Sequence, residues 1–178
     1  MKAMIIPGNG NTDISENWYL YLKGELEKNG VQVIAKTMPD PDIARKEYWL
    51  PFIEQQIGEG EDVILIGHSS GALAIMRYLE THKVLGAVLV GACYTDLGDA
   101  KEKQSGYYNK VWQWDNMKIN SKWIILFASK DDPYIPVAEP RFINENLRTE
   151  YHEYVNKGHF NASTIPELVE VLKPHFPT

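Results

Sequence analysis

Short runs of apolar residues alternate along this chain with longer stretches in which apolar residues recur every three or four positions. Buried β-strands are expected where the short runs lie, at residues 3–6, 31–35, 63–66, 87–90, 123–127 and 149–155. Helices are expected where the spacing is helical, near residues 18–29, 48–57, 71–79, 139–147 and 165–172. Pro51 falls inside the second helix, which we expect it to kink or divide. The alternation predicts a parallel sheet with helices on both faces.

The most informative local pattern lies at residues 63–79, where an apolar run meets a helical stretch. The sequence Gly67-His68-Ser69-Ser70-Gly71 separates the two, so G-x-S-x-G stands between a strand and a helix. In that context the pattern is typical of a nucleophile elbow, a sharp turn that presents its serine at the edge of the sheet. Ser69 is therefore the predicted nucleophile, and the alternative is an ordinary turn between a strand and a helix.

A serine hydroxyl needs a general base within hydrogen-bond reach, and that base needs an orienting acid. Reactive groups gather at the carboxyl ends of parallel strands, so both partners are expected just after the strands at 123–127 and 149–155. Asp131 and Asp132 follow the first of these strands, and His159 follows the second. We predict His159 as the base and favour Asp132 over Asp131 as the acid. His68 lies within the elbow, and we expect its side chain to point away from the nucleophile.

Acyl transfer also needs two backbone N–H groups directed at the developing oxyanion. Ser70, directly after the nucleophile, is expected to supply one of them. The loop after the first strand, Pro7-Gly8-Asn9-Gly10, is expected to supply the other through the N–H of Asn9. The alternative for this loop is a simple tight turn.

A long segment at residues 93–121 follows the fourth strand and is expected to be irregular. It is rich in aromatic residues, and segments of this length in compact proteins usually serve a function. We predict that it forms a lid over Ser69, with Trp112 and Trp114 walling an apolar substrate pocket. The alternative is that the aromatic residues simply bury the segment against the sheet.

Composition narrows the class of protein further. The chain has 178 residues, 44% of them hydrophobic and 24% charged, which suits one domain spanning residues 1–178. The net charge of −6 argues against a nucleic-acid partner. Cys93 is the single cysteine, and no apolar stretch reaches the length of a membrane span. We expect a cytoplasmic protein that does not bind membranes. Zinc-ligand spacing and a dinucleotide fingerprint are both absent, so neither a metal nor another cofactor is expected.

These stretches together resemble the retinoblastoma-binding protein 9 family of small serine hydrolases of the α/β-hydrolase fold. The similarity extends over nearly the whole chain and includes PGNG at 7–10, MPDP at 38–41, WLPF at 49–52, IGHSSGA at 66–72, MRYLETH at 76–82, DLGD at 96–99, SGYY at 105–108, WQW at 112–114, DDP at 131–133 and GHF at 158–160. The resemblance implies a mostly parallel six-stranded sheet in the order 2-1-3-4-5-6. It also implies a catalytic triad of Ser69, Asp132 and His159, which favours Asp132 over Asp131.

The resemblance does not carry every property of the family to this chain. Mammalian members are linked to retinoblastoma protein through a Leu-x-Cys-x-Glu motif, and the matching region here, residues 56–61, has no cysteine. Binding to retinoblastoma protein is therefore not expected. The predicted activity is hydrolysis of a small-molecule ester or amide through an acyl-enzyme on Ser69. The alternatives are a protein-interaction module on a hydrolase scaffold and acyl or thioester transfer by the same three residues.

Overall fold

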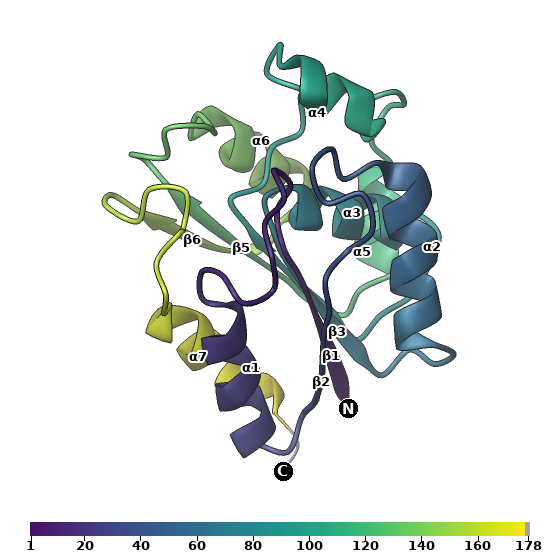
Figure 1. The fold of residues 1–178 in the computed structure, drawn as a ribbon, viewed down its shortest axis with the longest axis vertical. Helices are drawn as coiled ribbons and strands as arrows, with labels where there is room; N and C mark the ends of the chain where they lie inside the picture. Colours follow the sequence, from purple (N-terminus) through teal and green to yellow (C-terminus); the bar gives the residue numbers. More distant parts are fainter. Residues whose placement is uncertain (177–178) are drawn as a thin grey trace.

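The computed structural model describes residues 1–176 and contains a six-stranded sheet in the order β2-β1-β3-β4-β5-β6 (Figure 1). Every neighbouring pair of strands is parallel. The predicted sheet and its strand order are therefore confirmed. The strands are β1 (Lys2–Ile6), β2 (Gln32–Ala35), β3 (Val63–His68), β4 (Gly86–Val90), β5 (Ile124–Ser129) and β6 (Glu150–Tyr154).

Helices cover both faces of this sheet (Figure 1). On one face lie α1 (Tyr19–Lys28) and α7 (Pro166–Leu172), which is followed by a short 3₁₀ helix (Lys173–His175). The opposite face is covered by α2 (Lys46–Ile57), α3 (Ser70–Leu79), α5 (Trp114–Ile119) and α6 (Ala138–Leu147). A further short helix, α4 (Ala100–Ser105), lies beyond the carboxyl ends of the strands.

The central strands explain why the sheet forms in this order. Every residue of β3, β4 and β5 is buried, as expected of strands with a helical layer on each side. Successive side chains of β3 enter opposite cores: Val63 and Leu65 pack with α2 and α3, whereas Ile64 and Ile66 pack with α1 and α7. The edge strands β2 and β6 contain no fully buried residue. The strand that leads into the elbow therefore lies in the fully buried interior of the sheet.

Two sequence predictions about regular structure, a helix divided at Pro51 and an irregular segment at 93–121, were wrong. Helix α2 runs without interruption from Lys46 to Ile57, so Pro51 does not divide it. The ring of Pro51 lies on the exposed side of the helix, where the lost backbone hydrogen bond does not leave a buried group unpaired. The segment at 93–121 is not wholly irregular, because it contains α4 and α5.

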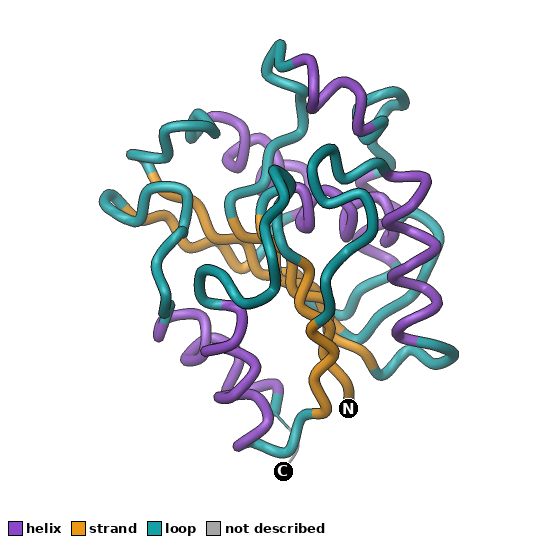
Figure 2. The backbone as a smooth tube through the Cα atoms, in the orientation of Figure 1, coloured by secondary structure: helices purple, strands orange, loops and turns teal. Residues whose placement is uncertain are grey.

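The loops that follow the strands lie at the carboxyl edge of the sheet, toward the top of the view in Figure 2, whereas the loops that lead into the strands lie at the opposite edge. Parallel strands end at the same edge, so residues distant in sequence meet there. Within residues 1–176, no helix is long and apolar enough to cross a membrane.

Candidate active site

Ser69 occupies a strained turn between a strand and a helix. Strand β3 ends at His68 and α3 begins at Ser70, so only Ser69 separates the two elements. Its φ of 53° and ψ of −117° lie in a region that side-chain-bearing residues rarely adopt. The Ser69 N–H donates to the carbonyl of Val90 at 2.8 Å. A Cβ on Gly71 would overlap the carbonyl oxygen of Ile6, so the helix can start this close to β1 only with glycine there.

His159 and Asp132 meet at the same edge of the sheet. The Nδ1 of His159 lies 2.7 Å from the Oδ2 of Asp132. The other carboxylate oxygen, Oδ1, accepts the backbone N–H groups of Tyr134 at 2.9 Å and Ile135 at 3.0 Å. Both the Asp132 and the His159 side chains are largely buried, at 2% and 10% exposure. The loop after β5 therefore fixes this carboxylate in contact with the imidazole.

Asp131, the competing acid, has a different place in the structure. Its Oδ1 accepts hydrogen bonds from the Ser129 hydroxyl at 2.6 Å and the Gly158 N–H at 2.9 Å. The Ser129 hydroxyl is the first cause that lowers the pKa of Asp131. This carboxylate joins the loop after β5 to the loop after β6, and it does not contact the imidazole of His159 among the described residues.

The imidazole of His159 packs against a glycine that sequence reasoning did not single out. Gly91 follows β4 with a φ of +61°, and a Cβ there would lie 3.3 Å from the Cε1 of His159. A side chain would therefore be strained and would also press on the imidazole. The only sequence signal was a glycine directly after the apolar run of β4.

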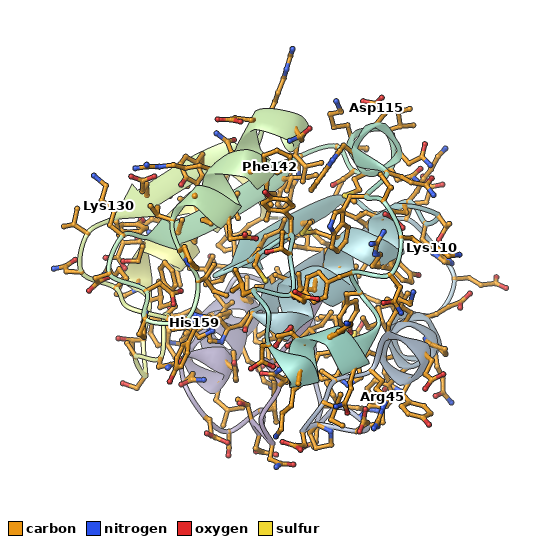
Figure 3. The ribbon with its side chains drawn as sticks, turned by 90° about the horizontal axis from the view of Figure 1, so that it is seen from above. Arg45, Lys110, Asp115, Lys130, Phe142 and His159 are labelled. Carbon is orange, nitrogen blue, oxygen red and sulfur yellow. The ribbon has the colours of Figure 1, made fainter. Side chains whose placement is uncertain are left out.

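A cavity of about 570 Å³ contains both Ser69 and His159. Its wall also includes Asn9 from the loop after β1 and Leu97 and Glu102 from the segment at 93–121. Figure 3 looks onto this edge of the sheet and shows His159 inward of Lys130 and Asp115, which lie at the periphery. Within the described residues no hydrogen bond joins the Ser69 hydroxyl to His159; catalytic contacts of this kind often tighten only when substrate binds.

The expected oxyanion donors belong to two segments that lie next to Ser69, the loop after β1 and the start of α3. The loop after β1 passes so close that a Cβ on Gly8 would lie 3.3 Å from the Cβ of Ser69. Neither the Asn9 N–H nor the Ser70 N–H donates a hydrogen bond to any residue in the range 1–176. Ser70 is also the first residue of α3, where backbone N–H groups have no partner in the helix and the helix dipole favours negative charge.

Glu102 is a carboxylate in the cavity wall that sequence reasoning missed. Its Oε1 accepts the side-chain amide of Asn9 at 2.7 Å, and its Oε2 accepts the Tyr108 hydroxyl at 2.9 Å. Burial raises the pKa of Glu102. The contact with Asn9 joins α4 to the loop after β1. No sequence pattern marked Glu102, because it lies on a polar six-residue helix.

Trp112 and Trp114 do not lie where the sequence analysis placed them. Neither side chain lines the cavity that contains Ser69. Trp112 is buried, donates its indole N–H to the carbonyl of Tyr94 at 2.8 Å and lies under the guanidinium of Arg77, 3.6 Å from the ring centroid. Trp114 packs on Trp112 and on Phe142 of α6. The structure therefore does not place these tryptophans in the wall of this cavity, because Trp112 packs on Arg77 of α3 and Trp114, at the start of α5, packs on α6.

The remaining polar groups near Ser69 can be described by their charge. Burial raises the pKa of the Cys93 thiol to about 12, so this cysteine lines the cavity as a neutral side chain. Burial lowers the pKa of His68 to about 3, so His68 is neutral as well. Residues 1–176 contain no group of three or more His, Cys, Asp or Glu side chains placed to hold a metal ion.

A parallel sheet whose central strand leads into a strained serine, with a histidine and an aspartate in contact at the same edge, defines the α/β-hydrolase class. The chain belongs to the serine hydrolase family, whose sequence model matches residues 3–167. It is 44% identical over 174 residues to the serine hydrolase RBBP9 of Rattus norvegicus, an alignment that covers 97% of this chain and 94% of the relative. The protein is therefore a hydrolase.

Two further similarities support the fold. The putative hydrolase YdeN of Bacillus subtilis is 25% identical over 170 residues, covering 91% of this chain and 90% of the relative. The crystal structure of the ydeN gene product superposes with a TM-score of 0.87 over 98% of this chain and 97% of that one. Est1E from Butyrivibrio proteoclasticus, solved with bound ferulic acid, superposes with a TM-score of 0.77 at 13% identity over 98% and 87% of the two chains, which shows a shared fold.

Proposed function

We propose that this hydrolase cleaves a small ester or amide through an acyl-enzyme on Ser69. The observation that carries the proposal is the 2.7 Å contact between His159 and Asp132 beside the cavity that Ser69 lines. A histidine oriented by a carboxylate next to a serine at a strained turn is the arrangement that activates a hydroxyl for attack on a carbonyl.

The proton positions follow from the geometry. Asp132 accepts the Nδ1–H of His159, which leaves the lone pair of Nε2 free to take the proton of the Ser69 hydroxyl. As that proton leaves, the serine oxygen bonds to the substrate carbonyl carbon, and the N–H groups of Asn9 and Ser70 stabilise the resulting oxyanion. His159 then protonates the leaving alcohol or amine, and an acyl-enzyme remains. Water repeats the sequence, releasing the acid and restoring Ser69.

The cavity is of the size that small-molecule sites occupy, and residues 93–102 supply part of its wall. On this proposal these residues serve as the lid, whereas the later part of the segment, with α5, secures it to the rest of the molecule. A small-molecule substrate is consistent with the serine hydrolase family and with a cavity wall that combines Leu97 with polar side chains.

The proposal is tested by comparing Asp132→Asn with Asp131→Asn in steady-state hydrolysis of a small chromogenic ester. Asp132→Asn should lower kcat by roughly 10³- to 10⁴-fold, because the imidazole loses the acceptor that sets its tautomer. Asp131→Asn is the matched control: it removes a neighbouring carboxylate that joins two loops and should cost far less. Equal losses in the two variants would contradict the assignment of Asp132 as the orienting acid.

A further inference from the structure

A chain of hydrogen bonds built on the buried side chains of Tyr19 and His68 lies behind the site, and the proposed reaction steps do not use it. His68 is 2% exposed, with its Nδ1 2.7 Å from the hydroxyl of Tyr19 and its Nε2 2.7 Å from the backbone carbonyl of His159. The Tyr19 oxygen also accepts the N–H of Gly8 at 3.4 Å and the side-chain amide of Asn17 at 3.3 Å. These hydrogen bonds therefore connect the loop before Asn9 with the loop that contains His159.

The direction of each bond follows from what its partners can do. A carbonyl only accepts, so the Nε2 of His68 must have the hydrogen and donate it to His159. A neutral imidazole then has its lone pair on Nδ1, so the Tyr19 hydroxyl donates its proton to that nitrogen. Burial keeps both groups in these states, because it lowers the pKa of His68 to about 3 and raises the pKa of Tyr19 to about 12.

The loop that contains His159 depends on outside support for its shape. The residues on either side of His159 both have positive φ, 53° at Gly158 and 57° at Phe160. For Phe160 this backbone conformation is costly. The indole N–H of Trp18 donates to the carbonyl of Phe160 at 3.0 Å, so two consecutive carbonyls of this loop accept hydrogen bonds from buried side chains.

We propose that Tyr19 and His68 are positioning residues that hold the loop of the base and the loop of the oxyanion donor in register with Ser69. Their side chains act through backbone groups: His68 through the carbonyl of His159, and Tyr19 through the N–H of Gly8. The inference rests on the proposed role of Ser69 as the nucleophile. Loss of these hydrogen bonds should therefore lower kcat more than it changes KM, because they hold the loops of the reacting groups and do not contact residues 93–102, which supply another part of the cavity wall.

Tyr19→Phe removes only the hydroxyl of Tyr19, and a second buried tyrosine provides a matched control. Tyr107 is also fully buried, and its hydroxyl has no hydrogen-bond partner among the described residues. Tyr19→Phe should lower kcat by about tenfold with KM within about twofold of the wild type. Tyr107→Phe should leave both constants unchanged. If the two variants have the same kcat, the proposal is overturned.

Two substitutions of His68 separate a positioning role from simple packing. Gln can still donate an N–H toward the carbonyl of His159, whereas Leu of similar size cannot. His68→Gln should therefore keep a higher kcat than His68→Leu when the two are compared at temperatures equally far below their melting temperatures. If the two variants have the same kcat under these matched conditions, the substitutions act only through stability, and the proposal is contradicted.

A readout independent of activity separates this inference from the proposed function. Ring ¹⁵N spectra of the wild-type protein should show His68 protonated at Nε2 and unprotonated at Nδ1. In Tyr19→Phe the proton should stay on Nε2, because the carbonyl of His159 still accepts it, whereas the ¹⁵N signal of Nδ1 should shift because its hydrogen bond from the hydroxyl is gone. A wild-type His68 with its proton on Nδ1 would overturn the inference. A wild type that fails to react at Ser69 would instead overturn the proposed function and leave the tautomer result standing.

Discussion

At the scale of single residues, burial decides which charges the groups around Ser69 can have. It raises the pKa of Cys93 to about 12 and lowers that of His68 to about 3, and it also raises the pKa of Glu102. In each case the effect favours the neutral form, as expected where water is excluded. Asp132 is buried too, but its two oxygens accept hydrogen bonds from three donors.

His68 makes the stability of the fold depend on pH in a defined direction. Burial is the main cause of its lowered pKa, the neighbouring His159 adds to it, and Asp132 and the bond to the His159 carbonyl oppose it. As pH falls from 6.5 towards 3, the unfolded chain takes up a proton at His68 that the folded protein does not. The contribution of His68 to the free energy of unfolding is therefore full above pH 6.5 and is lost as pH falls through this window.

We expect the free energy of unfolding of the wild type to fall by about 2 kcal/mol more than that of His68→Gln between pH 7 and pH 5. Urea unfolding at the two pH values measures the difference, and other titrating groups cancel in the comparison. Parallel losses in the two proteins would contradict the assignment of a neutral, buried His68. A ring ¹⁵N titration of the wild type provides a second check, since His68 should stay neutral at pH 5.

At the scale of elements, the segment at 93–121 divides into two parts with different tasks. Residues 93–102 line the cavity with Ser69, whereas the later part is fastened to α3. Arg77 of α3 holds this later part in place. Its guanidinium donates to the carbonyl of Tyr107 at 2.7 Å and to that of Lys110 at 2.6 Å. The same guanidinium packs over the ring of Trp112. An aromatic-rich sequence predicted one function for the whole segment, but burial assigns the tryptophans to packing.

Trp112→Ala should therefore lower stability without changing substrate preference. The substitution removes a buried ring and leaves the carbonyl of Tyr94 and the face of Arg77 without their partner, at a cost of about 3–5 kcal/mol. Thermal unfolding measures the loss, and the ratio of kcat/KM for a bulky and an acetyl ester measures preference. Val111→Ala, a substitution at an 88% exposed side chain, is the control and should change neither. If the ratio of kcat/KM values changed while the melting temperature stayed the same, Trp112 would contact the substrate, and this prediction would be contradicted.

At the scale of the whole molecule, the sequence predicted the helices and strands that depend on patterns within a short stretch of the chain. The apolar runs located all six strands, and the spacing around Ser69 located the turn between β3 and α3. The alternation of strands and helices implied a parallel sheet, and parallel topology brings strand ends to one edge. That is why His159 and Asp132, 27 residues apart in the chain, could be expected to meet.

Contacts decided by tertiary packing could not be predicted in the same way. Gly91 matters because the imidazole of His159 lies against it, and Glu102 matters because a short helix places it beside Asn9. His68 was expected to point away from the nucleophile. The structure adds that its ring nitrogens contact Tyr19 and the loop of His159, pairings between residues 49 and 91 positions apart. A pattern of residue types along the chain contains no information on such pairs.

The proposed function depends most on the Ser69 hydroxyl being the group that becomes acylated. The direct test is to treat the protein with a fluorophosphonate probe and to locate the adduct by mass spectrometry of the digested protein. We predict one adduct on Ser69, its loss in Ser69→Ala, and its retention in Ser70→Ala, since that variant keeps the backbone N–H of residue 70. A folded wild-type protein that gains no adduct, or an adduct located on Ser70 or another residue, would contradict the central claim.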